Sequence, residues 1–231
     1  FDSVFLIDPA TSAVLDTIRF HSFRSLTVVF GGRSQNPNDT DGDGSIGDPV
    51  GGSATNREGI FDFAQSLYDT GWDVMAFDST NGNINAVISV AEQEIKSAYD
   101  YRMLDPFQGG SGFGIMGYSW GGGATHDLVE RLYVDGYFPF FAVYLDAVVH
   151  GAISTNAPQD EWPTETFYLL NIWQPNPILE YGGGPIFNPE EMSPFSDLEE
   201  QQFPALDHYS IDDDAMVQQL IRTRLNQQMV R

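Results

Sequence analysis

Cysteine is absent from the 231-residue chain. The chain therefore has no disulfide, no thiolate nucleophile and no cysteine-based zinc site. Basic residues are also few, because ten lysines and arginines, with Lys96 as the only lysine, stand against 33 acidic residues. The resulting net charge of −23 argues against nucleic acid and against anionic membranes as partners.

Long hydrophobic runs are missing as well, since no apolar stretch reaches the roughly 18 residues that a membrane span needs. The length and the 42% hydrophobic content still allow one domain with a sizeable core. The chain opens with Phe1 and shows no signal peptide, so we expect a processed form or a fragment of a longer precursor. Its charge is compatible with a saline or calcium-containing exterior, and we expect a secreted or extracytoplasmic protein. A generic acidic bacterial protein is the alternative, and composition does not separate the two.

The most informative stretch, residues 113–132, changes from a strand pattern to a helix pattern at a serine between glycines. There, Gly117-Tyr118-Ser119-Trp120-Gly121 fits the G-x-S-x-G nucleophile elbow, a sharp turn that exposes one serine hydroxyl. Glycines are needed where backbone approaches backbone, and the following helix directs its positive end at the serine. An ordinary glycine-rich turn is the alternative, but the strand-to-helix context favours a nucleophile.

At these residues the chain resembles the α/β-hydrolase superfamily, of the lipase and esterase type. The resemblance extends from about Ser25 to the C-terminus. It implies an α/β fold in a single domain over residues 1–231, with a mostly parallel central sheet, helices on both faces and little or no lid. It also implies that the catalytic residues follow the order serine, acid, histidine along the chain.

A short apolar run at residues 26–30 predicts a buried strand that leads into Gly31-Gly32-Arg33. In the superfamily, the loop at this point supplies one backbone N–H of the oxyanion hole, and the residue after the nucleophile supplies the other. The resemblance assigns these donors to Gly32, or its neighbour Arg33, and to Trp120. A simple glycine turn is the alternative.

Four histidines are candidates for the general base. His21 precedes the oxyanion strand and His126 lies on the elbow helix, so both are expected to be surface or packing residues. His208 stands just before a final amphipathic helix with an acidic start, which is where the superfamily places its base. His150 is the second candidate.

The acid is predicted to be Asp146, at the end of the strand at residues 141–148. Pancreatic-type lipases carry their acid after this strand, in a similar Leu-Asp setting. Many other superfamily members carry it one strand later, but here that strand, residues 167–173, is followed by Gln174. A cap or turn role is the alternative for Asp146, and the fallback acids are Glu180, Glu190 and Glu191.

Residues 174–204 are rich in proline, glycine, asparagine and aromatic residues and are long for a structureless connection. Such a stretch predicts a functional loop. Its aromatic residues either line an acyl pocket or pack the loop onto the sheet. The residues predicted to contact substrate are Tyr118, Trp120 and Trp173.

A possible calcium loop is placed in residues 36–50, after the oxyanion strand. The residues 39–46 match the first eight positions of an EF-hand loop, but Val50 replaces the bidentate glutamate at position twelve. We expect a free-standing structural Ca²⁺ site, with a solvated turn as the alternative and no cofactor needed for catalysis. The expected ligands are Asp39, Asp41, Asp43, Ser45 and Asp48.

Two short apolar runs around a turn predict an N-terminal β-hairpin in residues 1–20. We expect it to form the antiparallel edge of the hydrolase sheet, and the alternative is a remnant of an upstream repeat domain.

Together, these assignments predict a serine hydrolase that cleaves carboxylic esters through a covalent acyl-enzyme. Ester rather than amide cleavage follows from the lipase-like position of the acid and the lack of a recognisable peptidase feature. The alternatives are a peptidase or acyltransferase on the same residues, or a non-catalytic calcium-dependent binding module with a degenerate hydrolase fold. The predicted partner is an ester substrate, and the oligomeric state stays open.

Overall fold

The computed structural model describes residues 2–7, 14–20, 25–33, 35, 59–79, 84–102, 112–149, 157–163, 166–175, 182–186 and 197–229. The predicted calcium ligands lie outside the described residues, as do His21, His150 and the three fallback glutamates.

A six-stranded parallel sheet forms the centre of the fold, in the order β4-β3-β5-β6-β7-β8. The inner strands are continuous apolar runs because helices cover both of their faces, and β3 and β5 are buried along their whole length. The α/β prediction is confirmed. The strands are β3 (Leu26–Phe30), β4 (Asp73–Phe77), β5 (Phe113–Tyr118), β6 (Phe141–Leu145), β7 (Tyr168–Trp173) and β8 (Asp197–Gln202).

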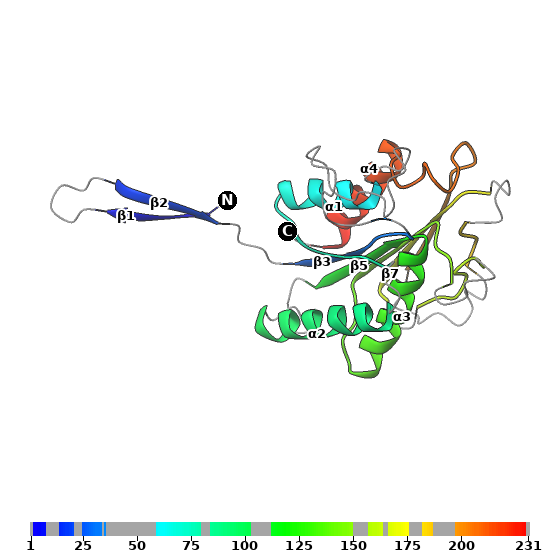
Figure 1. The fold of residues 1–231 in the computed structure, drawn as a ribbon, viewed down its shortest axis with the longest axis horizontal. Helices are drawn as coiled ribbons and strands as arrows, with labels where there is room; N and C mark the ends of the chain where they lie inside the picture. The colour runs from blue at the N-terminus through cyan, green and yellow to red at the C-terminus, as the bar shows by residue number, and fades with distance from the viewer. Residues whose placement is uncertain are drawn as a thin grey trace.

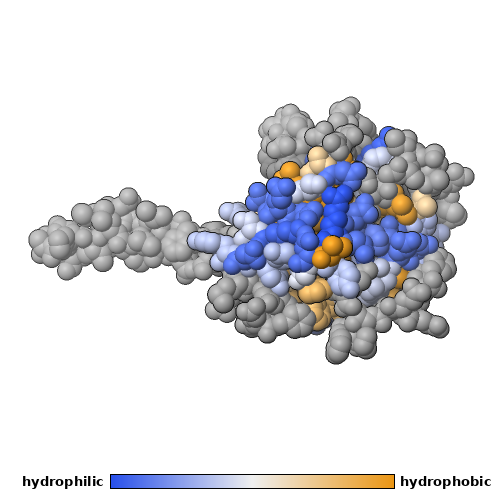
Figure 2. Space-filling model, turned by 90° about the horizontal axis from the view of Figure 1, so that it is seen from below, coloured by the Kyte–Doolittle hydropathy of each residue, from blue (hydrophilic) through white to orange (hydrophobic). Residues whose placement is uncertain are grey.

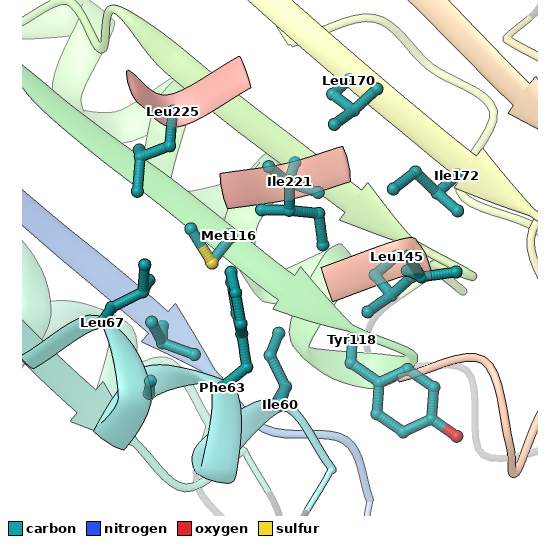
Figure 3. Close-up of a cluster of buried hydrophobic side chains, with 14 of the residues drawn as sticks. Ile60, Phe63, Leu67, Met116, Tyr118, Leu145, Leu170, Ile172, Ile221 and Leu225 are labelled. Atoms are coloured by element: carbon teal, nitrogen blue, oxygen red, sulfur yellow. The ribbon is translucent and has the colours of Figure 1, made fainter. Parts of the chain in front are cut away.

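Two helices cover each face of the sheet (Figure 1). On one face, α1 (Gly59–Asp69) and α4 (Ala215–Gln228) pack their apolar sides on the strands through Ile60, Phe63 and Ile221 (Figure 3). On the other face, α2 (Ile84–Arg102) and α3 (Trp120–Val134) pack through a second apolar layer. Each fully buried Leu or Ile contributes about 1.5–3 kcal/mol to stability, so the two layers hold the sheet rigid beneath its loops.

The outer sides of the helices are mainly polar. Figure 2 shows a face on which the described residues are mostly hydrophilic, with apolar residues in small groups among them. Within the described ranges, no helix combines the length and the apolar character that crossing a membrane requires.

The N-terminal hairpin does not take its predicted place at the edge of the large sheet. β1 (Asp2–Ile7) and β2 (Val14–Phe20) pair antiparallel in a two-stranded sheet of their own (Figure 1), and the edge strands of the large sheet are β4 and β8. The physical reason is that strands joined by a short connection satisfy each other's backbone groups locally, at little cost in loop closure. Pairing with the central sheet is therefore not required for the hairpin to form.

The stretch predicted to be one long loop after Trp173 contains an edge strand. β8 pairs with β7 from Tyr168↔Asp197 to Trp173↔Gln202, although its sequence is DLEEQQ. Polar side chains suit an edge because it faces solvent and must not pair with other chains. Glu199 on β8 is held by the guanidinium of Arg224 on α4, which lowers the pKa of this carboxyl to about 2.

Candidate active site

Ser119 occupies a strained turn between β5 and α3. Its φ of 54° lies in the left-handed region, which is unfavourable for a residue with a side chain. The flanking glycines are required by close contacts, since a Cβ on Gly117 would lie 2.0 Å from the carbonyl oxygen of Gly121. A Cβ on Gly121 would lie 2.4 Å from the carbonyl oxygen of Phe30. The local structure is thus the strand-to-helix turn that the motif predicts.

Three side chains from distant parts of the chain form one hydrogen-bonded series at the carboxyl end of the sheet. Ser119 Oγ lies 2.9 Å from His208 Nε2, and His208 Nδ1 lies 2.7 Å from Asp146 Oδ2. The serine follows β5, the carboxylate follows β6, and the histidine lies in the connection between β8 and α4. All three are buried, so water competes little for these contacts. The structure brings the three predicted catalytic residues together.

Further donors surround the carboxylate of Asp146. Its Oδ1 accepts from the backbone N–H of Gly183 at 2.7 Å and from that of Gln174 at 3.2 Å. The Gln174 side-chain amide also donates to Oδ2, at 3.2 Å. These bonds offset the cost of burying a carboxylate that is fully enclosed. Gln174 and Gly183 were not predicted as site residues. The run Gly182–Gly183–Gly184 is the signal in the sequence that points to a close backbone approach.

Tyr118 supports His208 from the side of the buried core. The tyrosine is 5% exposed, and its hydroxyl donates to the backbone carbonyl of His208. Figure 3 shows its ring at the margin of the cluster that contains Ile60 and Phe63. Burial raises the pKa of Tyr118 well above its ordinary value, so the hydroxyl remains a donor. The structure thus gives Tyr118 a contact to the histidine, and contact with substrate stays a prediction.

The loop after β3 lies against the nucleophile, as predicted for an oxyanion loop. A Cβ on Gly32 would come within 3.3 Å of Ser119 Cβ. The N–H of Gly32, however, donates to Gln35 Oε1 at 2.8 Å, which corrects its assignment as an oxyanion donor. The other predicted donor on this loop, the N–H of Arg33, stays a prediction. The Arg33 guanidinium lies 4.9 Å from the ring centroid of Trp120, a cation–π contact between the two residues that remain predicted as donors.

The remaining residues predicted from the sequence are Trp120, Trp173 and His126. Trp120 opens α3 beside Ser119, and Trp173 ends β7 one residue before Gln174. Both are partly exposed at the carboxyl end of the sheet, where ligands bind in open α/β folds, and their contact with substrate stays a prediction. His126 takes no part in the series, because its Nδ1 contacts the hydroxyl of Tyr144 at 2.9 Å.

A second buried carboxylate, Asp212, lies four residues after His208. It is 2% exposed and accepts from Gln35 Nε2 at 2.6 Å and from the backbone N–H of Ile60. Burial, followed by the nearby charge of Asp213, raises the pKa of Asp212 to about 7. In the sequence this residue appears only as one of three aspartates before the last helix, where a helix-capping role explains it equally well.

Metal ligation is not evident in the part of the chain that the structure describes, where no group of three or more His, Asp or Glu could hold an ion. The predicted Ca²⁺ loop lies outside that part, so it stays a prediction.

The fold is shared with solved structures of low sequence identity. No family model and no curated protein matches the chain. A sugar hydrolase from Lactococcus lactis superposes with a TM-score of 0.50 at 14% identity, covering 91% of this chain and 90% of that one. Esterase PE8 (TM-score 0.49, 12% identity, 90% and 94% covered) and human thioesterase 2 (0.49, 12%, 88% and 95%) are also similar. The strand order, the turn that carries Ser119 and this likeness show that the chain has the α/β-hydrolase fold.

Proposed function

We propose that the protein is a serine hydrolase of carboxylic esters. The observation that carries the proposal is the series of contacts from Ser119 Oγ to His208 Nε2 and from His208 Nδ1 to Asp146. A serine hydroxyl is a weak nucleophile until a base within hydrogen-bond reach removes its proton, and the base needs a third group to orient it.

In the first half of the reaction, Ser119 Oγ attacks the ester carbonyl carbon while His208 Nε2 takes the hydroxyl proton. Asp146 holds the proton on Nδ1 and stabilises the imidazolium that forms. The carbonyl oxygen becomes an oxyanion, which the backbone N–H groups of Trp120 and Arg33 are proposed to bind. Each such donor lowers the barrier by about 3–4 kcal/mol.

Collapse of the tetrahedral intermediate breaks the bond to the alcohol oxygen, which leaves with the proton from His208. The acyl group is then bonded to Ser119. Water attacks the acyl carbon as His208 takes a proton from it, and the carboxylic acid departs when Ser119 recovers its proton. The cycle requires no group beyond these residues and water.

Ester cleavage is preferred over amide cleavage because of where the acid lies. Asp146 follows β6, the strand after the nucleophile helix, in a placement that resembles pancreatic-type lipases.

Active-site labelling tests the proposal. A fluorophosphonate probe should add once to the protein, and peptide mass spectrometry should place the adduct on Ser119. Ser119→Ala should abolish the adduct, whereas Ser89→Ala, at a half-buried α2 serine that accepts from Arg131 on α3, should leave it unchanged. An unlabelled wild-type protein, as expected of a binding module, would contradict the proposal.

A further inference from the structure

We propose that Gln35 and Asp212 are positioning residues that fix the oxyanion loop relative to the catalytic base. The inference deepens the proposed function and rests on it. The Gly32 N–H lies next to the nucleophile but is hydrogen-bonded to the Gln35 side chain.

Gln35 closes a tight turn in the loop after β3. Its backbone N–H donates to the Gly32 carbonyl at 3.1 Å, and its side-chain oxygen accepts the Gly32 N–H at 2.8 Å. Both polar groups of Gly32 are therefore occupied by one residue. Because peptide planes are rigid, this double contact sets the orientation of the next peptide, whose N–H belongs to Arg33.

The other end of the Gln35 amide is anchored to the turn that carries the base. Its Nε2 donates to Asp212 Oδ2 at 2.6 Å, and both side chains are at least 95% buried. Asp212 is four residues from His208, and its backbone carbonyl accepts from the Gln218 side chain on α4 at 2.9 Å. The bridge Gly32–Gln35–Asp212 therefore links the oxyanion loop to the segment that holds His208.

The start of α1 is shaped around this bridge. Gly59 has a φ of 50°, and a Cβ there would lie 2.0 Å from Asp212 Oδ2 and 2.3 Å from Gln35 Nε2. The Gly59 N–H donates to Asp213 Oδ1 at 3.0 Å, so the helix start and the two aspartates fix each other. Only glycine leaves room for the bridge at this point.

The chemical consequence concerns the transition state. An oxyanion donor acts only when its nitrogen lies about 3 Å from the position where negative charge develops, with its hydrogen pointing there. A loop that shifts by an ångström loses much of that effect while still binding substrate. Loss of the bridge should therefore lower kcat much more than it raises KM.

Amide hydrogen exchange and ester kinetics test the inference together on the full chain. Gln35→Ala and Asp212→Ala should each speed exchange of the Gly32 and Arg33 amides and lower kcat for a p-nitrophenyl ester by about 10- to 100-fold, with KM changed by less than about threefold. Phenylboronic acid, which forms a tetrahedral adduct on the serine, should bind these variants more weakly by a similar factor. Asp212→Asn keeps an acceptor for Gln35 and should recover part of the loss.

Gln65→Ala is the matched control, because it removes an exposed Gln–Asp hydrogen bond on α1. It should change neither exchange at the loop nor kcat. Unchanged exchange in Gln35→Ala would overturn the bridge, and faster exchange with unchanged kcat would overturn its catalytic role. A wild type without turnover would instead refute the proposed function and the catalytic role together, while exchange would still decide whether the bridge exists. If Asp212→Ala fails to fold, the exchange and kinetic measurements on Gln35→Ala still decide the proposal.

Discussion

Two residues of the proposed triad carry backbone strain. Ser119 has a φ of 54° and Asp146 a φ of 46°, and within the described ranges they are the non-glycine residues with positive φ. Left-handed conformations cost about 1–2 kcal/mol per residue and persist only where the surroundings determine them. At Asp146, the backbone N–H donates to the Ile172 carbonyl at 2.7 Å while Gly183 and Gln174 donate to the carboxylate. The site is therefore organised before substrate arrives.

Replacement of Asp146 by asparagine tests the role of the acid. Asp146→Asn should lower kcat by about 10³- to 10⁴-fold, because an amide that donates to His208 Nδ1 favours the wrong imidazole tautomer. Circular dichroism should show that the fold is retained. Asp135→Asn, which alters the exposed partner of Lys96 beyond the end of α3, is the control and should keep full activity. A loss below tenfold in Asp146→Asn would remove Asp146 from the triad.

The pH dependence of stability should report on Asp212. In the folded chain its pKa is raised to about 7 from an ordinary value of 3.8, by burial and then by Asp213. Between these two values the folded state keeps a proton that the unfolded state releases. The contribution of Asp212 to stability is thus highest at low pH and falls as pH rises towards about 7.

Asp212→Asn removes this titration. The Tm of the variant relative to wild type should therefore increase between about pH 4 and about pH 8, by roughly 10 °C. Asp69→Asn, on the surface of α1, should show no such trend. A Tm difference for Asp212→Asn that does not vary with pH would show that the carboxyl ionises normally in the folded chain.

At the scale of elements, the turn between β5 and α3 packs closely against the carboxyl end of β3. Gly121 lies so near the backbone of Phe30 and Gly31 that a methyl group would meet their carbonyl oxygens at 2.4 and 2.6 Å. This contact places the start of α3 beside the oxyanion loop. The two predicted sources of oxyanion donors are thus brought together by main-chain packing.

Gly121→Ala should therefore disturb activity as well as stability. We expect a stability loss of about 1–3 kcal/mol and a fall in kcat per folded molecule of at least about tenfold, because the helix must move away from β3. Gly71→Ala is the control. Gly71 has a φ of 95°, so alanine there should also lower stability, but the space around its Cβ position is open and no neighbouring element has to move. Its kcat should be unchanged. Equal kcat values for both variants would contradict the proposed coupling of the elbow to the loop.

Local features of the fold and of the site can be predicted from the sequence, whereas features that depend on contacts between distant residues mostly cannot. The buried strands, the elbow and the position of His208 before α4 follow from apolar runs and neighbouring residues. The donors to Asp146 and the Gln35–Asp212 contact join residues 28, 37 and 177 positions apart, and the glycine run that contains Gly183 is the one local signal among them. β8 was not predicted because its side chains are mostly polar, as suits an edge strand, and a polar sequence of this kind is typical of a loop.

At the scale of the whole molecule, the net charge of −23 sets the behaviour in solution. Repulsion between so many carboxylates opposes the compact state, and dissolved salt weakens it by screening. A bound divalent cation would weaken the repulsion between the carboxylates nearest to it. The aspartates at positions 39, 41 and 43 have the spacing of ligands in a Ca²⁺ loop. We therefore retain the prediction of a structural Ca²⁺ loop.

Chelation tests the calcium prediction. Removing Ca²⁺ with EGTA should lower Tm, and adding Ca²⁺ back should restore it, because a ligand that binds only the folded state stabilises that state. The variant Asp41→Asn/Asp43→Asn should have a low Tm that no longer responds to Ca²⁺. Mg²⁺ serves as the control for charge screening. A Tm unaffected by EGTA would show that the loop is a solvated turn.

The central claim is that Ser119 performs covalent catalysis on an ester. Its most direct test is the hydrolysis of p-nitrophenyl esters, from acetate to decanoate, by wild type and Ser119→Ala, with Ca²⁺ and with a chelator. We predict wild-type turnover that depends on acyl length and a loss of about 10⁶-fold in kcat in the variant, to near the uncatalysed rate. Equal rates in the two proteins across the series would contradict the account.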